Sequence, residues 1–469
     1  MSSRNAEKLH SLDLGVARFT EFSITVILTE WINADFYQLK LRELATAWPV
    51  LSTRLDRIRT KLLYSSSSRI HIMWAHKNIA TPLATKLPEY AQDDLPLSID
   101  CSHLDEYFKF PAMTTITAPT RITKPAVFRL QVVQFMDAAV LKFTVQHPLC
   151  DAKGLYKIVS AYCDLLDGRK IEALNPRTPL ELVNEEKLSD DTGDEVEPLM
   201  TEQESDSSSY FSKGWGSLVM KGVSQWSRRA VTDPRISKAV LVPLPVMMHW
   251  RTVADQLGVR VSRNDLLMAW LYMCSLPKAG KSALNFTFVL NVEQFLNASG
   301  DLHNPWCLVP VNNIPEAVLQ RVRSAPNQIE TLIQLAQCFR NIIEQARSPK
   351  FLEQTLKDHA DAPVIAPKDF GKSEPNIRVS SWSYIDLYSL KFASGPRPYG
   401  DYSNVLTPRW IAGNIDFCPA FVWANLTCDD TIVTWNESRG YWIQGRLHQE
   451  IWERIAQSSA LVLLHRAGK

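Results

Sequence analysis

The sequence predicts an α/β protein of two domains, and three observations lead to that prediction. The chain has 469 residues, enough for two domains of roughly 200 residues each. A strand–turn–strand–helix pattern fills residues 127–166, so both kinds of element occur in the first half. An acidic, serine-rich stretch at 184–209 separates the two halves, because such a composition cannot bury enough apolar surface to offset the entropy of ordering.

The strand–turn–strand–helix pattern has clear limits. Residues 127–135 and 140–146 are apolar enough for two strands, and a short turn joins them as a hairpin. Residues 155–166 carry apolar side chains at helical spacing. His147 and Asp151 lie between the second strand and this helix, so the histidine ends a hairpin that leads into a helix.

His147 and Asp151 are the candidate catalytic residues, in an HxxxD pattern. Imidazole is the side chain best suited to take a proton near neutral pH, and the end of a strand holds it rigidly. The aspartate, followed by a small residue and Gly154, can fix the local backbone. The pattern predicts an acyl-transfer site in which His147 is the general base for a hydroxyl or amine. HxxxD also occurs by chance, so a purely structural histidine is the alternative.

The chain resembles the BAHD family of plant and fungal acyl-CoA-dependent acyltransferases. Beyond strand, HxxxD, glycine and helix, three stretches are similar to family motifs in the expected order. Residues 41–54 resemble the first helix with its P-x-L-x-x-R exit, and 261–271 resemble the VS-x-ND-x-L-x-A helix start. Residues 380–395 resemble the SW…Y-x-x-DFGWG segment. The departures from these motifs favour the fungal branch of the trichothecene O-acetyltransferase type.

The resemblance implies two chloramphenicol acetyltransferase-like domains, each a mixed β-sheet flanked by helices, with an interdomain channel. We expect an N-terminal domain at 1–183 that carries HxxxD, a crossover linker at 184–235, and a C-terminal domain at 236–469. Acyl-CoA and the acceptor would approach His147 from opposite faces of the channel. The candidate lining residues are three tryptophans: Trp215, Trp306 and Trp382.

The resemblance also implies roles for the site residues. His147 would take the acceptor's proton without a covalent enzyme intermediate, and Asp151 would point away from substrate and support the loop through an arginine. Trp382 and Ser380 match residues that lie near the reacting carbonyl, so they are the oxyanion candidates. An indole N–H can only donate, which suits a developing negative charge. The alternative for Trp382 is simple core packing.

The departures from the family motifs predict a reversed ion pair. DFGWG is replaced by residues 391–395, with Lys391 at the acidic position and Ser394 at the tryptophan position. The arginine of the family's D-x-R strand, which usually pairs with that acid, is replaced by Glu293. Since a one-sided loss would leave a charge unpaired, we expect a structural ion pair between Glu293 and Lys391. The alternative is that both side chains face water.

The composition is that of an ordinary globular enzyme, and we expect the protein to be cytoplasmic and monomeric. Hydrophobic residues make up 45% and charged residues 22% of the chain. A net charge of +1 gives no indication of nucleic acid or an anionic membrane as partner, and no apolar run is long enough to span a membrane. The eight cysteines form no CxxC pair and no metal-ligand spacing, which predicts reduced thiols and no metal. Cys150 is interpreted as a small apolar filler behind His147.

The predicted function is therefore transfer of an acyl group from acyl-CoA, a co-substrate, to a hydroxyl or amine of a small specialised metabolite. No permanently bound cofactor is expected. Two alternatives stay open. One is an enzyme of this fold that has lost CoA use and catalyses a His-assisted cyclisation, dehydration or cycloaddition, which the altered DFGWG segment favours. The other is a non-catalytic protein that binds a small molecule.

Overall fold

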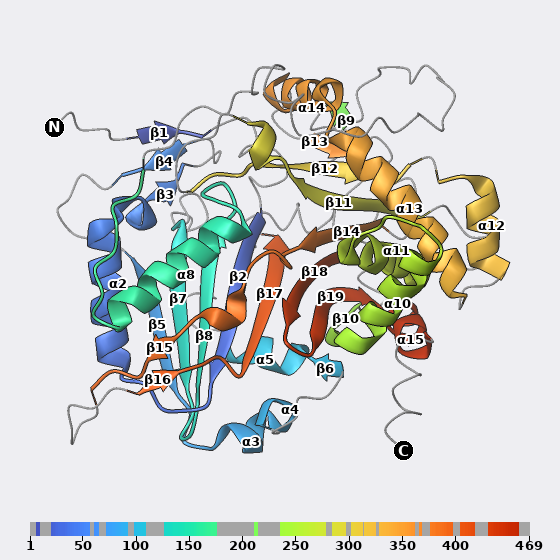
Figure 1. Ribbon diagram of the computed structural model, residues 1–469. Helices are drawn as coiled ribbons and strands as arrows, with labels where there is room; N and C mark the ends of the chain where they lie inside the picture. The colour runs from blue at the N-terminus through green and yellow to red at the C-terminus, as the bar shows by residue number, and fades with distance from the viewer. Residues whose placement is uncertain are drawn as a thin grey trace.

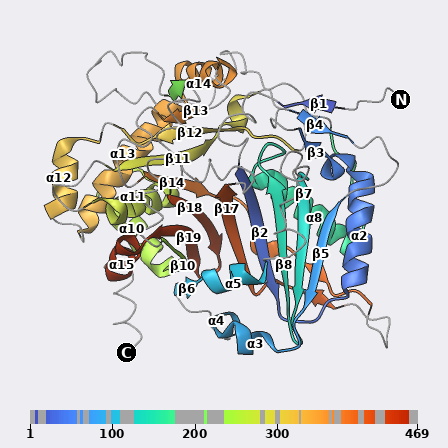
Figure 2. The same cartoon turned by 180° about the vertical axis from the view of Figure 1, so that it is seen from behind.

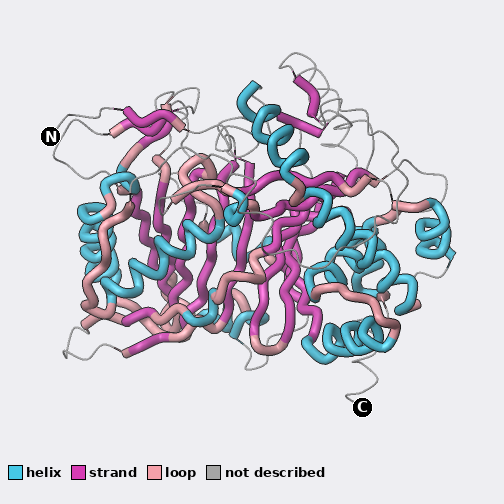
Figure 3. Tube along the Cα trace, turned by 45° about the horizontal axis from the view of Figure 1, so that its top comes forward, coloured by secondary structure: helices cyan, strands magenta, loops and turns pink. Residues whose placement is uncertain are grey.

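Two β-sheets dominate the protein, whose structure is a computed structural model (Figure 1). One sheet has five strands in the order β17-β2-β8-β7-β5, and the other has seven in the order β12-β11-β14-β18-β19-β10-β6. The strands of both sheets run side by side through the middle of the molecule (Figure 3). The residues that the structure describes are 6–9, 20–56, 61–64, 72–91, 98–108, 126–175, 211–213, 235–277, 284–296, 302–312, 314–324, 328–361, 365–367, 376–396, 404–417 and 430–458.

The five-stranded sheet consists of β2 (Thr20–Leu28), β5 (Met73–Asn78), β7 (Phe128–Gln134), β8 (Ala139–Gln146) and β17 (Trp410–Phe417). It is mixed, because β5 and β7 run parallel whereas its other neighbouring strands run antiparallel. Helices α2 (Ala34–Ala47) and α8 (Ala152–Leu166) pack together over one face, and the reverse view shows the strands in front of α8 (Figure 2). All nine residues of β2 are buried, so both faces of this central strand are covered.

The seven-stranded sheet consists of β6 (Ser98–Asp100), β10 (Arg235–Pro243), β11 (Asn285–Asn291), β12 (Trp306–Pro310), β14 (Asn376–Ser381), β18 (Asp430–Glu437) and β19 (Gly440–His448). It is also mixed, because β11, β14 and β18 are parallel neighbours. Its associated helices include α10 (Leu244–Gln256), α11 (Arg263–Ser275), α13 (Ile329–Ala346) and α15 (Gln449–Gln457). Both sheets therefore match the predicted architecture of a mixed sheet flanked by helices.

The smaller elements surround these two sheets. They are β1 (Ala6–Lys8), η2 (Pro49–Ser52), β3 (Arg54–Leu55), β4 (Lys61–Leu63), α3 (Leu83–Lys86), α4 (Pro88–Ala91), α5 (Ser102–Tyr107), β9 (Phe211–Lys213), η4 (Glu293–Phe295), α12 (Glu316–Ser324), α14 (Pro349–Asp361), β13 (Ile365–Pro367), η5 (Leu387–Ser389), β15 (Phe392–Ala393) and β16 (Val405–Leu406). None of the described helices has the length and hydropathy that a membrane crossing requires.

The two halves of the chain exchange strands. β6, from the first half, pairs with β10 in the seven-stranded sheet, whereas β17, from the second half, pairs with β2 in the five-stranded sheet. β17 also contacts β18, so the two sheets meet at this strand. The domain limits 1–183, 184–235 and 236–469 stay a prediction, and the acidic stretch 184–209 lies outside the described residues.

The elements predicted around HxxxD are confirmed. The two expected strands are β7 and β8, and the expected helix is α8, which begins three residues earlier than its apolar pattern. The early start has a local cause: Asp151 is the N-cap and its side chain accepts the Gly154 N–H at 2.9 Å. The predicted helix start at 261–271 is α11, where Ser262 and Asp265 form a capping box.

Gly154 lets the first turn of α8 pack against the loop behind the candidate base. A Cβ added to Gly154 would lie 2.4 Å from Cβ and 2.9 Å from Sγ of Cys150. Cys150 is fully buried, which agrees with its interpretation as a filler, and the six described cysteines are free thiols. Close packing of this loop against α8 therefore requires a residue without a side chain at position 154, that is, glycine.

We expect Gly154→Ala to destabilise the protein. In an open helix the change would stabilise by about 1 kcal/mol, but overpacking against Cys150 costs about 1–3 kcal/mol. Thermal and urea denaturation should show a net loss, whereas Ser160→Ala on the same helix should change stability by less than about 0.5 kcal/mol. A Gly154→Ala protein as stable as the parent would contradict this account of the packing.

Candidate active site

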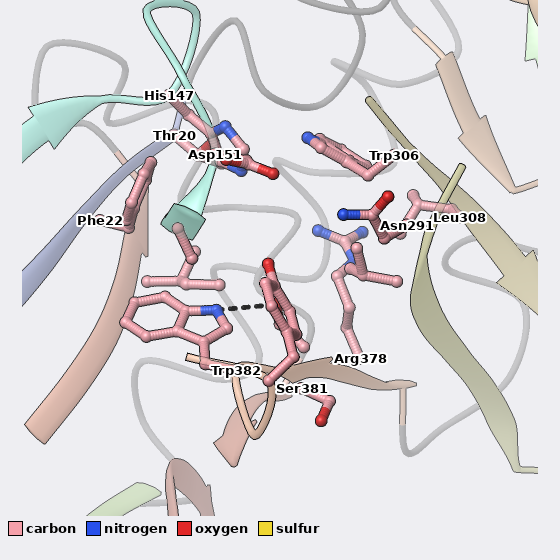
Figure 4. A pocket seen from close by; sticks show the side chains of 15 residues that line it. Thr20, Phe22, His147, Asp151, Asn291, Trp306, Leu308, Arg378, Ser381 and Trp382 are labelled. Carbon is pink, nitrogen blue, oxygen red and sulfur yellow. Dashed lines mark hydrogen bonds between the residues drawn. The ribbon is translucent and has the colours of Figure 1, made fainter. Parts of the chain in front are cut away.

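A pocket lies between the two sheets, with about 670 Å³ of unfilled space that is partly continuous with solvent (Figure 4). Side chains from β2, β17 and the β8–α8 loop form one wall, and side chains from β11, β12, β14 and the turn after β14 form the other. The lining residues are Thr20, Phe22, His147, Asp151, Ala152, Val289, Asn291, Trp306, Leu308, Arg378, Ser380, Ser381, Trp382, Tyr384 and Ile415. The pocket therefore contains the predicted residues His147, Asp151, Ser380 and Trp382, as well as Trp306; Trp215 lies outside the described residues.

His147 is fixed at the end of β8 by the neighbouring strand and by two aromatic rings. Its backbone N–H donates to the carbonyl of Thr20 at 3.0 Å. The ring centroid lies 4.8 Å from that of Phe22 and 5.2 Å from that of Trp306. The imidazole is half-buried and lines the pocket, so it lies between the walls contributed by the two sheets.

Asn304 orients the imidazole of His147. Its Nδ2 donates to the His147 carbonyl at 2.9 Å, and its Oδ1 lies 3.0 Å from His147 Nδ1. A carbonyl can only accept, so the amide nitrogen faces the backbone and Oδ1 faces the ring. Nδ1 must then carry the hydrogen, which places the basic lone pair of a neutral imidazole on Nε2. The sequence interpretation missed Asn304, because a single loop asparagine 157 positions away carries no pattern.

Asp151 acts as a helix cap rather than as an arginine partner. Its carboxylate accepts the Gly154 N–H, and among the described residues no arginine pairs with it, so the predicted arginine contact is not found in that part of the chain. The side chain is also a pocket-lining group and does not simply point away. The pKa of Asp151 is raised to about 6, because burial and, to a smaller extent, the Glu293 carboxylate raise it by more than the Gly154 N–H and Lys153 lower it.

The two oxyanion candidates are linked to one another. Trp382 Nε1–H donates to Ser380 Oγ at 3.1 Å, the bond drawn as a dashed line in Figure 4. The indole is 1% exposed and packs against Gly413, where an added Cβ would lie 2.5 Å from the ring. The indole N–H is therefore directed at Ser380. Of the pair, the Ser380 hydroxyl retains a hydrogen that it can donate into the pocket.

The predicted ion pair between Glu293 and Lys391 is wrong. Glu293 pairs with Lys153 at 2.7 Å, on the first turn of α8. Lys391 is exposed and lies with Tyr156 and Arg169 at a different hollow on the outer side of α8. Lys153 thus neutralises Glu293, the residue that replaces the arginine of the family's D-x-R strand. The pair can form because the start of α8 lies close to the end of β11.

The segment that replaces DFGWG lies away from the pocket. None of residues 391–395 lines the pocket, and Ser394 is fully buried. The backbone carbonyl of Ser394 accepts the N–H of Asn33 at the start of α2. Gly395 has φ +80° and a hydrogen that faces Phe36, which explains why this last glycine is present. The altered segment therefore reshapes the contact with α2 and not the pocket.

A buried charge network lies beside the strand ends that carry the base. Arg129 donates to both carboxylate oxygens of Glu21, at 2.9 and 2.5 Å, and Gln146 Nε2 donates to Glu21 at 2.7 Å. Burial by itself would raise the pKa of Glu21, but Arg129 and Gln146 outweigh it and hold that pKa below its usual value. The network joins β2, β7 and β8 next to His147. No group of three or more His, Cys, Asp or Glu side chains that could hold a metal ion occurs in the described ranges.

Two mixed sheets with a histidine at a strand end in the pocket between them define the chloramphenicol acetyltransferase-like class of fold. The chain is similar in structure to TRI101 of F. sporotrichioides complexed with coenzyme A and T-2, with a TM-score of 0.61, 13% identity and 98% of each chain covered. It is also similar to vinorine synthase, with a TM-score of 0.58, 11% identity, and 97% of this chain and 92% of that one covered. The predicted fold is confirmed.

In sequence, the chain is similar to "Acetyltransferase peniE" from Penicillium patulum, with 22% identity over 307 residues. That match covers 58% of this chain and 59% of the relative's length. No protein-family model matches the chain. The predicted likeness is thus confirmed in fold over almost the full length, and in sequence the chain is similar to an acetyltransferase over a part of its length.

We expect Asp151→Asn to change how stability depends on pH. The pKa of Asp151 is raised, so its neutral form favours the fold; this contribution is complete below pH 3.8 and is lost as pH rises through about 6. A shift of this size corresponds to about 3 kcal/mol. Asparagine still caps the helix and stays neutral, so the variant should gain stability relative to the parent between pH 4 and 7.

Urea denaturation at several pH values measures this gain. Asp255→Asn, at an exposed carboxylate on α10, is the matched control and should show no such trend. Parallel stability curves for Asp151→Asn and the parent would show that the carboxyl titrates normally.

Proposed function

We propose that the protein transfers an acyl group from acyl-CoA to a hydroxyl or amine of a small molecule, with His147 as general base. The observation that carries the proposal is the geometry of His147, whose Nδ1–H is held by Asn304 Oδ1 at 3.0 Å in the pocket between the sheets. This arrangement gives Nε2 the basic lone pair at the place where two substrates can meet.

The proposed reaction has two proton transfers at one atom. Nε2 of His147 takes the proton of the acceptor as its oxygen or nitrogen attacks the thioester carbonyl. The tetrahedral intermediate collapses with cleavage of the C–S bond, and the imidazolium returns the proton to the thiolate. No covalent enzyme intermediate forms, so no nucleophilic serine or cysteine is needed. General base catalysis of this kind contributes about 10²–10⁴-fold to the rate.

Ser380 is the proposed donor to the oxyanion, and Trp382 is its positioning residue. The indole N–H donates to Ser380 Oγ, so the hydroxyl hydrogen is directed elsewhere and can stabilise negative charge on the carbonyl oxygen. Because Gly413 leaves room for the indole, the donor is held before substrate binds. A preorganised donor needs no rearrangement during reaction, which is the source of its benefit.

Use of CoA is supported by the names of similar proteins and by the position of the altered segment. One relative is named as an acetyltransferase, and one solved structure holds coenzyme A. The altered segment 391–395 is the feature that favours loss of CoA use, and none of its residues lines the pocket. It therefore gives no support to a CoA-independent cyclisation, dehydration or cycloaddition. A monomeric state and a cytoplasmic location remain predictions.

We expect His147→Ala to lower acyl transfer at least 10²-fold, because the general base is lost. The measurement is release of free thiol from acetyl-CoA with a panel of alcohols and amines. His249→Ala, which removes an exposed histidine on α10, is the control and should retain full activity. If wild-type protein binds small molecules but releases no thiol, acyl transfer is excluded and the two alternatives, a CoA-independent enzyme and a non-catalytic binding protein, are left.

We expect Asn304→Ala to lower kcat about tenfold to a hundredfold with little change in KM, since substrate contacts remain but the imidazole loses its fixed tautomer. Asn304→Asp should instead shift the acid limb of the pH–rate profile upward, because a carboxylate beside Nδ1 favours the imidazolium. Asn341→Ala on α13 is the exposed control. An unchanged acid limb in Asn304→Asp would mean that Asn304 does not set the protonation of the base.

A further inference from the structure

Tyr384 is the aromatic residue of the pocket whose ring is left open to a bound molecule. It lines the pocket and is 54% exposed, whereas Phe22, Trp306 and Trp382 on the same walls are 6% exposed or less. The proposed chemistry does not use it. Ligand pockets are mostly lined by apolar and aromatic side chains, with a few polar groups that fix the orientation of the ligand. Tyr384 combines both parts in one side chain.

A tight turn after β14 fixes the backbone of Tyr384. The Ile385 N–H donates to the carbonyl of Trp382 at 2.9 Å, which closes the turn 382–385. Trp382 and Ile385, at the two ends of the turn, are both buried, so the turn is anchored on each side. The ring of Tyr384 is therefore presented to the pocket from a fixed position, four residues after the proposed oxyanion donor Ser380.

The hydroxyl of Tyr384 keeps a hydrogen that it can donate. Asn291, the last residue of β11, accepts the Glu293 N–H at its Oδ1, at 2.8 Å, so its amide nitrogen is the group left to donate. The amide of Asn291 points into the pocket (Figure 4). Its hydrogen bond with Tyr384 lowers the pKa of the hydroxyl, as a bond donated to the phenol oxygen does. The O–H hydrogen of Tyr384 is then available to a bound molecule.

The surroundings of this hydroxyl favour a neutral oxygen over an anionic one. Although the ring is half exposed, burial of the hydroxyl end, and then the carboxylates of Asp151 and Glu293, raise the pKa of Tyr384 well above its usual value. The hydroxyl is therefore neutral near pH 7. Lys153 pairs with Glu293, but Asp151 lines the pocket itself. These carboxylates disfavour an anionic group at this place, whereas a carbonyl or ether oxygen can accept the hydrogen bond.

We propose that Tyr384 selects the acceptor: its ring packs against the carbon skeleton of the acceptor, and its hydroxyl donates to a neutral oxygen there. The acceptor then carries, besides its nucleophile, a carbonyl or ether oxygen. The proposal rests on the proposed function of His147. CoA bears phosphates, which the carboxylates disfavour at this end of the pocket, so the acceptor and not the acyl donor contacts Tyr384. A site with a polar group placed for one substrate oxygen rejects analogues that lack this oxygen, because the group is then left unpaired.

The test uses three probes that share a phenol nucleophile. They are 4-(4-hydroxyphenyl)butan-2-one, 4-butylphenol, which lacks the ketone oxygen, and 3-(4-hydroxyphenyl)propanoate, which has a carboxylate in place of the ketone. Calorimetric titration without acetyl-CoA should show that the parent binds the ketone more tightly than the carboxylate. Tyr384→Phe should weaken ketone binding about fivefold, the size of one neutral hydrogen bond, and leave 4-butylphenol binding unchanged. Tyr384→Leu should also weaken 4-butylphenol binding, by about threefold to tenfold, because the ring is lost.

The controls separate this subsite from the proposed reaction. Tyr156→Phe, at the hollow on the outer side of α8, should bind all three probes like the parent. Equal losses for the ketone and 4-butylphenol in Tyr384→Phe, no detectable ketone binding, or equal binding of ketone and carboxylate by the parent would overturn the subsite. The expected binding pattern without thiol release would leave the subsite standing and remove the acyl transfer. Thiol release with the same KM for the ketone in the parent and Tyr384→Phe would do the reverse.

Discussion

The hydrogen bonds between Asn304 and His147 are the constraint on which the site depends. His147 ends β8 in the five-stranded sheet, whereas Asn304 lies two residues before β12 in the seven-stranded sheet. The orientation of the imidazole is thus set by a residue from the other sheet. Any shift of one sheet relative to the other changes the direction of Nε2. The packing of the two sheets against each other therefore determines the direction of the basic nitrogen of His147.

The backbone of the base is held separately, from within its own sheet. Arg129 and Gln146 together satisfy the buried carboxylate of Glu21, so the charge is paired and hydrogen-bonded as burial requires. The neighbour of Glu21, Thr20, accepts the His147 N–H. This network fixes the ends of three strands next to the pocket. It holds the backbone of His147 in position, whereas a buried ion pair of this kind adds little net stability.

Regular elements could be predicted from the sequence, and long-range polar pairs could not. The hairpin of β7 and β8 and the start of α11 carry periodic or capping signals, which are local and therefore visible in one sequence. Asn304 has no such signal, since its role exists only after two sheets meet. Arg378 is one of several polar residues in β14, and alternation alone does not tell a solvent face from a pocket wall.

The error over Glu293 explains how this site tolerates a reversed charge. The prediction assumed that the lost arginine had to be replaced at the altered DFGWG segment. Lys153 neutralises Glu293, and the N-terminus of α8 satisfies Asp151 through the Gly154 N–H. A cap needs only a hydrogen-bond acceptor and not a cation, so Asp151 can be buried with a raised pKa and still hold the loop. Gly154 and Lys153 both lie in the first turn of α8, so both of these contacts depend on where α8 begins.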